Sequence, residues 1–125
     1  LRIESLASVS RSAYLLDGTV GIYLKYSTKR LPPWAFEFTA EHATELEKLR
    51  EIASEQWIVL ICGPVGIASA SLPQVEEISS RRSDGSYSLS VNWRPNHKFR
   101  LAGARSAPLL VADSAFPAAV VGFVD

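Results

Sequence analysis

The sequence predicts a mixed α/β (α+β) domain with one central mixed sheet of about six to eight short strands, one main helix and one shorter helix. Three observations predict this class. Residues 87–93 alternate between apolar and polar side chains, which indicates a half-buried strand. Residues 40–54 repeat Ala and Leu at helical spacing. Residues 57–62 are apolar without alternation, which is typical of a strand covered on both faces.

The composition is that of an ordinary globular domain. Of the 125 residues, 47% are hydrophobic and 21% are charged, and 13 basic residues balance 13 acidic ones. These values exclude a disordered tail, a collagen-like fibre and a globally polybasic nucleic-acid binder. The length predicts a single domain over residues 1–125. The single cysteine and the lack of a long apolar run predict a cytoplasmic protein with no membrane partner.

The first third of the chain predicts a hairpin and an edge strand. The Asp-Gly dipeptide at residues 17–18 favours a tight turn between the apolar residues 13–16 and an alternating strand over residues 19–27. Residues 34–38 place three aromatic side chains on one face. The Pro-Pro pair at residues 32–33 cannot donate to a central ladder, so we expect residues 34–38 to form a short strand or an edge.

Two helices are predicted from their first residues. Thr39 is expected to cap the main helix over residues 40–54, which leads directly into the buried strand. Ser71 begins a capping-box pattern, because a Gln follows three residues later. This pattern predicts a short second helix over residues 72–80.

Two further hairpins complete the expected sheet. The Gly-Pro-Val-Gly sequence at residues 63–66 favours a turn that returns the buried strand into residues 67–71. The alternating strand ends near residue 93 and is expected to turn back into residues 98–102. The tail over residues 107–125 is rich in Ala, Val, Leu and Phe, and we expect it to cover the core.

One stretch, from Tyr14 to Ser27, carries a constellation with catalytic chemistry. Asp17 ends one strand, and Lys25 lies on the polar face of the next. A helix and a buried strand follow. This arrangement resembles the core of the PD-(D/E)XK, or restriction-endonuclease-like, nucleases over about residues 12–62.

The resemblance implies a restriction-endonuclease-like fold and an Mg²⁺ cofactor. In that family an Asp and a Glu or Gln hold the divalent cation, and a Lys two residues after the second acid helps to activate the attacking water. Asp17 matches the first acid and metal ligand, and Lys25 matches the lysine. Tyr23 stands in place of the second acid, so Glu4 or Glu37 would have to complete the site. The alternative is that Asp17 is only a turn residue and Lys25 an exposed strand residue.

Two basic groups are candidates for binding nucleic acid. The first, Lys25 with Lys29 and Arg30, precedes Trp34, and cations beside an exposed aromatic ring suit single-stranded nucleic acid. The alternative places Trp34 in the core. The second group, on the polar face of the last hairpin, consists of Arg94, Lys98 and Arg100. Its side chains can contact phosphates, or they can simply prevent edge-to-edge aggregation.

Two hypotheses about function follow. The first is a nuclease-like domain with an incomplete catalytic site that contacts nucleic acid. The alternative is a non-enzymatic protein-interaction module, homodimeric through a sheet edge or through the apolar tail. Two carboxylates within about 5 Å of each other near Lys25 would favour the nuclease, because such a pair can share one cation.

Overall fold

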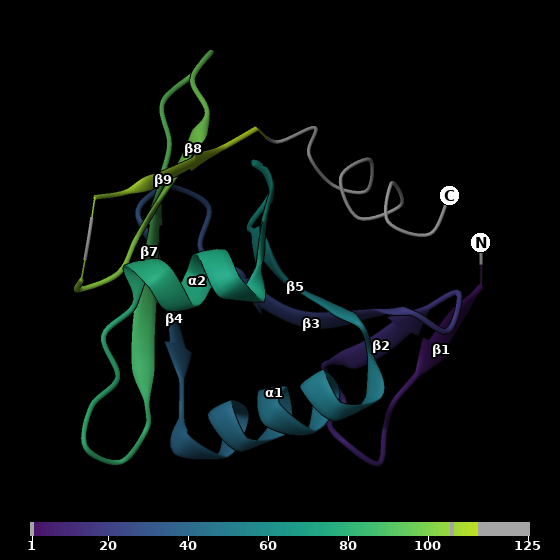
Figure 1. Ribbon diagram of the computed structural model, residues 1–125. Coiled ribbons are helices and arrows are strands. Elements are labelled where there is room, and N and C mark those ends of the chain that lie inside the picture. The colour runs from purple at the N-terminus through teal and green to yellow at the C-terminus, as the bar shows by residue number, and fades with distance from the viewer. Residues whose placement is uncertain (1, 106, 113–125) are drawn as a thin grey trace.

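The computed structural model describes residues 2–105 and 107–112, which form two helices and nine strands in two sheets (Figure 1). Sheet A has the strand order β1-β2-β3-β5-β6, and sheet B has the order β4-β7-β8-β9. The elements are β1 (Ile3–Ser5), β2 (Ala13–Leu16), β3 (Val20–Ser27), β4 (Trp34–Phe38), α1 (Ala40–Ile52), β5 (Glu55–Cys62), β6 (Gly66–Ser71), α2 (Leu72–Ile78), β7 (Tyr87–Asn92), β8 (Phe99–Ala102) and β9 (Leu109–Val111). The mixed α+β class is confirmed, whereas the single central sheet is wrong.

Sheet A contains the first two predicted hairpins. Leu16 pairs with Val20 across a turn in which Asp17 and Gly18 have φ angles of 46° and 75°. The second hairpin joins β5 to β6 and closes with Cys62 opposite Gly66. Strand β5 also pairs in parallel with β3, so it has a partner on both edges. Its buried stretch from Trp57 to Leu60 confirms the prediction of a strand covered on both faces.

Sheet B is entirely antiparallel and forms from the aromatic strand β4 and the last hairpin. Strand β4 cannot pair with β3, the strand that precedes it, because β3 already pairs with β2 and β5 along its two edges. It pairs with β7 instead, and the apolar sides of both strands point into the core. Figure 1 shows β4 and β7 running across the direction of β2 and β3. The expected single sheet is therefore divided in two, because β4 pairs with β7 and buries its aromatic side in the core from there.

The two helices begin where the sequence predicts and end about two residues earlier. Thr39 and Ser71 each form a capping box, in which the cap side chain and the third helical residue satisfy each other's backbone amide. Helix α1 packs on β3, and α2 contacts β5 and β6. The contact of α1 with β3 is close, because a Cβ at Gly21 would lie 2.8 Å from the side chain of Leu49.

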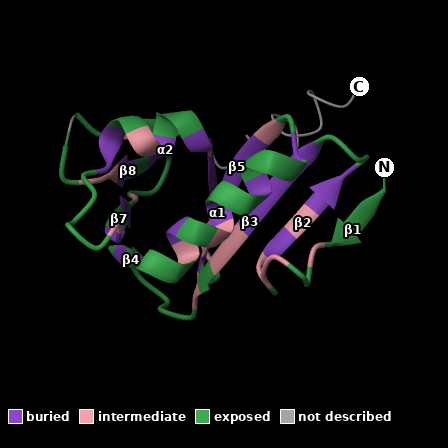
Figure 2. Ribbon diagram, turned by 60° about the horizontal axis from the view of Figure 1, so that its bottom comes forward, coloured by how far each residue is buried: buried purple, intermediate pink, exposed green. Residues whose placement is uncertain are grey.

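The main core lies where the two sheets and the two helices meet. It combines Tyr23, Ile58 and Leu60 from sheet A with Trp34, Phe38 and Leu89 from sheet B and Leu46 and Val75 from the helices. A second cluster, built around Val20, Ile22 and Val59, lies on the opposite side of sheet A. Figure 2 shows the buried residues along β2, β3 and β5 and the exposed outer face of α1.

Two further expectations from the sequence concern the apolar tail and the absence of a membrane partner. Of the tail that was expected to cover the core, Leu109–Val111 forms β9, and residues 113–125 lie outside the described residues. Neither helix formed by the described residues is long and apolar enough to cross a membrane.

Candidate functional site

Asp17 and Lys25 lie at opposite ends of strand β3. Asp17 belongs to the turn that precedes Val20, and its carboxylate accepts a hydrogen bond from the backbone amide of Arg2. Lys25 follows Val20 by five residues, which corresponds to about 17 Å along an extended strand. The family resemblance, in which the acid and the lysine share one site, requires these two charges to lie near each other, and they do not. Asp17 instead holds β1 against the β2–β3 turn.

Lys25 lies at the junction of the two sheets. Its ammonium group donates a hydrogen bond to the backbone carbonyl of Glu37 in β4. It also lies 3.1 Å from Nδ1 of His42 and 4.9 Å from the centre of the Phe38 ring. Burial lowers the pKa of Lys25, and the nearby carboxylates of Glu37 and Glu45 oppose that shift. Lys25 is half-buried, and the description of an exposed strand lysine is wrong because β4 covers it.

The residues expected to complete a metal site have other partners. The carboxylate of Glu4 lies 2.8 Å from Arg2, and that of Glu37 lies 2.6 Å from Arg82. Tyr23 is buried and donates a hydrogen bond of 2.5 Å to Glu45. Burial and this carboxylate raise the pKa of Tyr23, which keeps the phenol protonated. Among residues 2–105 and 107–112, no three His, Cys, Asp or Glu side chains form a group that could hold a metal ion.

Two neighbours of Lys25, namely His42 and Glu45, were not singled out as site residues from the sequence. Both lie on α1, which packs along β3. The buried stripe of this helix contains Ala43 and Leu46, so residues 42 and 45 flank it on the side facing β3 and β4. Helical spacing could have identified them only if the partner strand of α1 had been known.

The second basic group lies together at one end of sheet B. Arg94, Lys98 and Arg100 line a pocket of about 510 Å³ with Asn92, Trp93 and His97. None of the described residues that line this pocket carries a carboxylate. No carboxylate in the described part of the chain forms an ion pair with Arg94, Lys98 or Arg100. We call these three residues the basic end of sheet B.

The first basic group is close to the same end of the sheet. Trp34, the first residue of β4, pairs with Val91 near the end of β7. The loop that carries Lys29 and Arg30 therefore precedes β4 at the end of sheet B where Arg94 follows β7. The Lys29 ammonium donates to the carbonyl of Pro33 over 2.8 Å, whereas Arg30 is exposed. Trp34 lies in the core, as the alternative proposed, and its indole nitrogen donates to the carbonyl of Lys29.

The open face of sheet B also has a shallow trough, which begins at the Ser90–Ala102 pair, next to the Asn92–Arg100 pair of the basic end. Small side chains line about 290 Å³ of this trough: Ala35, Ser88, Ser90 and Ala102. Beyond them, at the far end, Arg82 pairs with Glu37 and donates to the hydroxyl of Ser88. The face therefore combines free positive charge at one end, small residues in the middle and a neutralised pair at the other end.

Comparison of the chain with protein-family models, curated proteins and solved structures finds no match.

Proposed function

We propose that this domain binds single-stranded nucleic acid on the open face of sheet B. One observation carries the proposal: the three cations of the basic end line one pocket that contains no carboxylate. Such cations attract phosphates, since each neutralised phosphate releases condensed counterions. The exposed Arg30 extends this positive region, because its loop lies at the same end of the sheet.

The form of the pocket favours a single strand. Trp93 is half-buried and lines the pocket beside the cations, where its exposed part offers a surface on which a base can stack. The Trp93 ring also packs against Phe99, with 6.4 Å between the two ring centres, and this contact helps to hold the indole in place. The small side chains of Ser90 and Ala102 let a ligand backbone approach the sheet closely. Proteins that bind single strands combine an aromatic side chain on which a base stacks with nearby cations that bind the phosphates.

The proposal is for binding without cleavage. Nuclease activity with Mg²⁺, as the family resemblance implies, would require Asp17 and Lys25 to act together. About 17 Å of strand lies between Val20, which follows the Asp17 turn, and Lys25. Lys25 is also engaged by Glu37 and His42. Nucleic acid is the partner that we propose, and a cytoplasmic location fits it and the single cysteine.

The test compares two pairs of substitutions by fluorescence anisotropy with a labelled oligo(dT). Lys98→Gln/Arg100→Gln removes two cations from the basic end, and Arg11→Gln/Lys48→Gln removes the same charges from exposed positions elsewhere. We expect the first pair to weaken binding about tenfold or more and to reduce the slope of log K against log salt by about 1.4, since a single strand contributes about 0.7 per phosphate.

The control pair should change affinity by less than about threefold, because it leaves the phosphate contacts in place. Equal losses for both pairs would contradict the proposal, and so would binding that is independent of salt. A duplex that binds more tightly than oligo(dT) would contradict the preference for a single strand.

A second candidate function, the homodimeric interaction module, has one observation in its favour. Strand β1 lies at the edge of sheet A, and all three of its residues are exposed, with Ile3 at 62%. An unpaired edge can pair with a second copy. Light scattering after size-exclusion chromatography tests this: a dimer that Ile3→Lys converts to a monomer would favour the module, and a monomeric parent protein would exclude it.

A further inference from the structure

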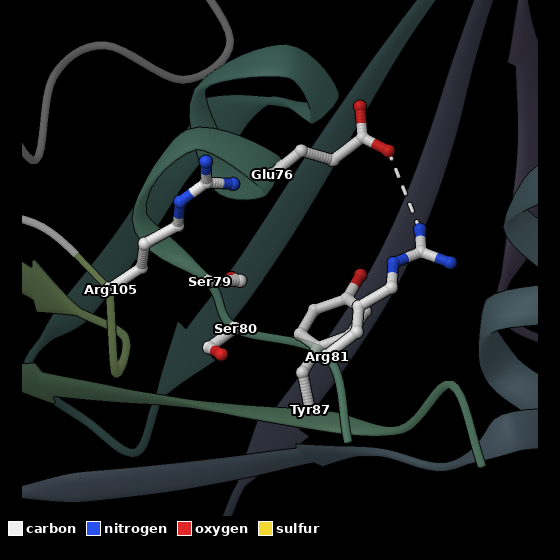
Figure 3. A pocket seen from close by; sticks show the side chains of 6 residues that line it. All are labelled: Glu76, Ser79, Ser80, Arg81, Tyr87 and Arg105. Carbon is white, nitrogen blue, oxygen red and sulfur yellow. Dashed lines mark hydrogen bonds and ion pairs between the residues drawn. The ribbon is translucent and has the colours of Figure 1, made fainter. Parts of the chain in front are cut away.

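A separate pocket of about 440 Å³ lies between α2, the start of β7 and the segment that follows β8 (Figure 3). Its lining includes Glu76 from α2, Tyr87 from β7, and Arg81 and Ser80 from the connection between them. Arg105, beyond β8, lies across the pocket from Arg81 in Figure 3. None of these residues lines the pocket at the basic end of sheet B.

The hydroxyl group of Tyr87 is the unusual feature of this pocket. Tyr87 is 1% exposed, and its hydroxyl oxygen has no hydrogen-bond partner in the described part of the chain. Figure 3 shows the hydroxyl rising from β7 toward the space between Glu76 and Arg81. Buried donors are nearly always satisfied, so this hydroxyl at the wall of a pocket has a hydrogen bond to offer to a bound acceptor.

The Tyr87 ring cannot readily turn away from the pocket. It stacks on the Phe38 ring, with the two ring centres 4.9 Å apart. The Arg81 guanidinium forms a cation–π contact with the Tyr87 ring, 5.6 Å from the centre of that ring. Burial raises the pKa of Tyr87 to about 12. The phenol is therefore protonated at neutral pH and offers its proton as a hydrogen-bond donor.

The residues that line the pocket carry one positive charge in excess, because Arg81 and Arg105 stand against the single carboxylate of Glu76. Glu76 accepts from Arg50 at 2.8 Å and from Arg81 at 3.4 Å, so its carboxylate is occupied by arginines. Arg105 forms no ion pair with any residue in the described ranges.

The backbone next to Arg105 is held against α2. The Arg105 amide donates to the carbonyl of Ile78 over 3.1 Å. A Cβ at Gly103 would lie 2.2 Å from that same oxygen, so only glycine allows this approach. The structure thus fixes the backbone from which the unpaired side chain of Arg105 lines the pocket.

We propose that this pocket binds a small organic carboxylate. One carboxylate oxygen accepts the hydrogen bond from Tyr87, and the guanidinium of Arg105 provides the planar pair of donors that suits a carboxylate. A monoanion matches the single excess positive charge of the pocket lining, whereas the charge of a dianion such as phosphate exceeds it. The volume of about 440 Å³ accommodates an organic acid of modest size.

Sodium benzoate is the probe, titrated into ¹⁵N-labelled protein and followed by two-dimensional NMR. We expect saturable shifts at the amides of Ser80, Tyr87 and Arg105. Neutral benzamide, which has the same shape, and inorganic phosphate should bind at least about tenfold more weakly, because one lacks the charge and the other carries an excess of it.

Two variants and two matched controls test the assigned roles. Tyr87→Phe and Arg105→Gln should each weaken benzoate binding by about tenfold or more, since each removes a hydrogen bond to a charged group. Tyr26→Phe and Arg11→Gln, at exposed positions outside the pocket, should leave it unchanged. Tyr87→Phe keeps the stacked ring and removes an unpartnered hydroxyl, so the ligand-free melting temperature should stay the same or rise.

Three results would overturn the proposal. One is benzoate binding that neither Tyr87→Phe nor Arg105→Gln weakens. Another is a titration in which the shifts do not saturate up to about 100 mM benzoate, because such a result would mean that benzoate has negligible affinity for the protein. The third is phosphate or benzamide binding as tightly as benzoate, which would exclude recognition of a monoanionic carboxylate.

Discussion

At the scale of single residues, Lys25 connects sheet A to sheet B. Its ammonium group bonds to the Glu37 carbonyl on β4, and its position over the Phe38 ring adds a cation–π contact. The bond also occupies a carbonyl on the β4 edge that faces away from β7. A lysine that an isolated strand would leave in water thus becomes part of the contact between the sheets.

Lys25→Ala is therefore expected to lower the free energy of unfolding by about 1 to 2 kcal/mol, because it removes a hydrogen bond from a charged donor together with the packing of the lysine stem. Urea denaturation measures the change. Lys48→Ala, at an exposed position on α1, is the matched control and should change stability by less than about 0.5 kcal/mol. If the two variants were equally stable, Lys25 would have no part in joining the sheets.

At the scale of elements, β5 holds sheet A together. It pairs with β3 in parallel and with β6 in the antiparallel sense, and its side chains enter both hydrophobic clusters. Leu60 and Ile58 face the main core, whereas Trp57 and Val59 face the second cluster. A strand with apolar contacts on both faces cannot alternate with polar residues, and this explains its continuous apolar run.

Leu60→Ala should cost about 2 to 5 kcal/mol of unfolding free energy, from lost burial and from the cavity left in a close-packed core. Leu60 is fully buried, so its neighbours cannot easily fill the space. Ile52→Ala, at a residue that is 46% exposed at the end of α1, provides the comparison and should cost less than about 1 kcal/mol. A loss below about 1 kcal/mol for Leu60→Ala would contradict the position of β5 inside the sheet.

At the scale of the whole molecule, the two sheets share one core. Side chains of sheet A, sheet B and both helices form a single cluster, so neither sheet keeps its apolar face covered without the other. Small domains with one continuous core usually unfold in a single cooperative transition. The shared core therefore predicts that the sheets lose their structure together.

Two tryptophans allow this to be measured, because Trp34 lies in sheet B and Trp57 in sheet A. In Trp57→Phe/Trp93→Phe the fluorescence reports mainly on sheet B, and in Trp34→Phe/Trp93→Phe it reports mainly on sheet A. Within each variant, the urea transition by fluorescence should coincide with the transition by far-UV circular dichroism. Transitions that differ in midpoint between the two probes would show that the sheets unfold separately.

The sequence by itself determined the features that depend on neighbouring residues. The caps at Thr39 and Ser71, the turn at Asp17 and the alternation along β7 all appear as predicted. Each rests on contacts within a few residues or on the repeat of one element, which the local sequence contains. The candidate cations at the basic end were likewise identified from the alternation of a single hairpin.

Only the tertiary structure decided which strands pair outside the predicted hairpins and which distant side chains meet. The pairing of β4 with β7 divided the sheet and brought Lys29 and Arg30 to the end that carries Arg94. The distance along β3 separated Asp17 from Lys25, while helix packing placed His42 beside that lysine. The pocket at Tyr87 likewise combines residues from α2, β7 and the segment after β8. The physical reason is that a strand edge accepts any partner of suitable register, so burial across the whole chain selects the pairing.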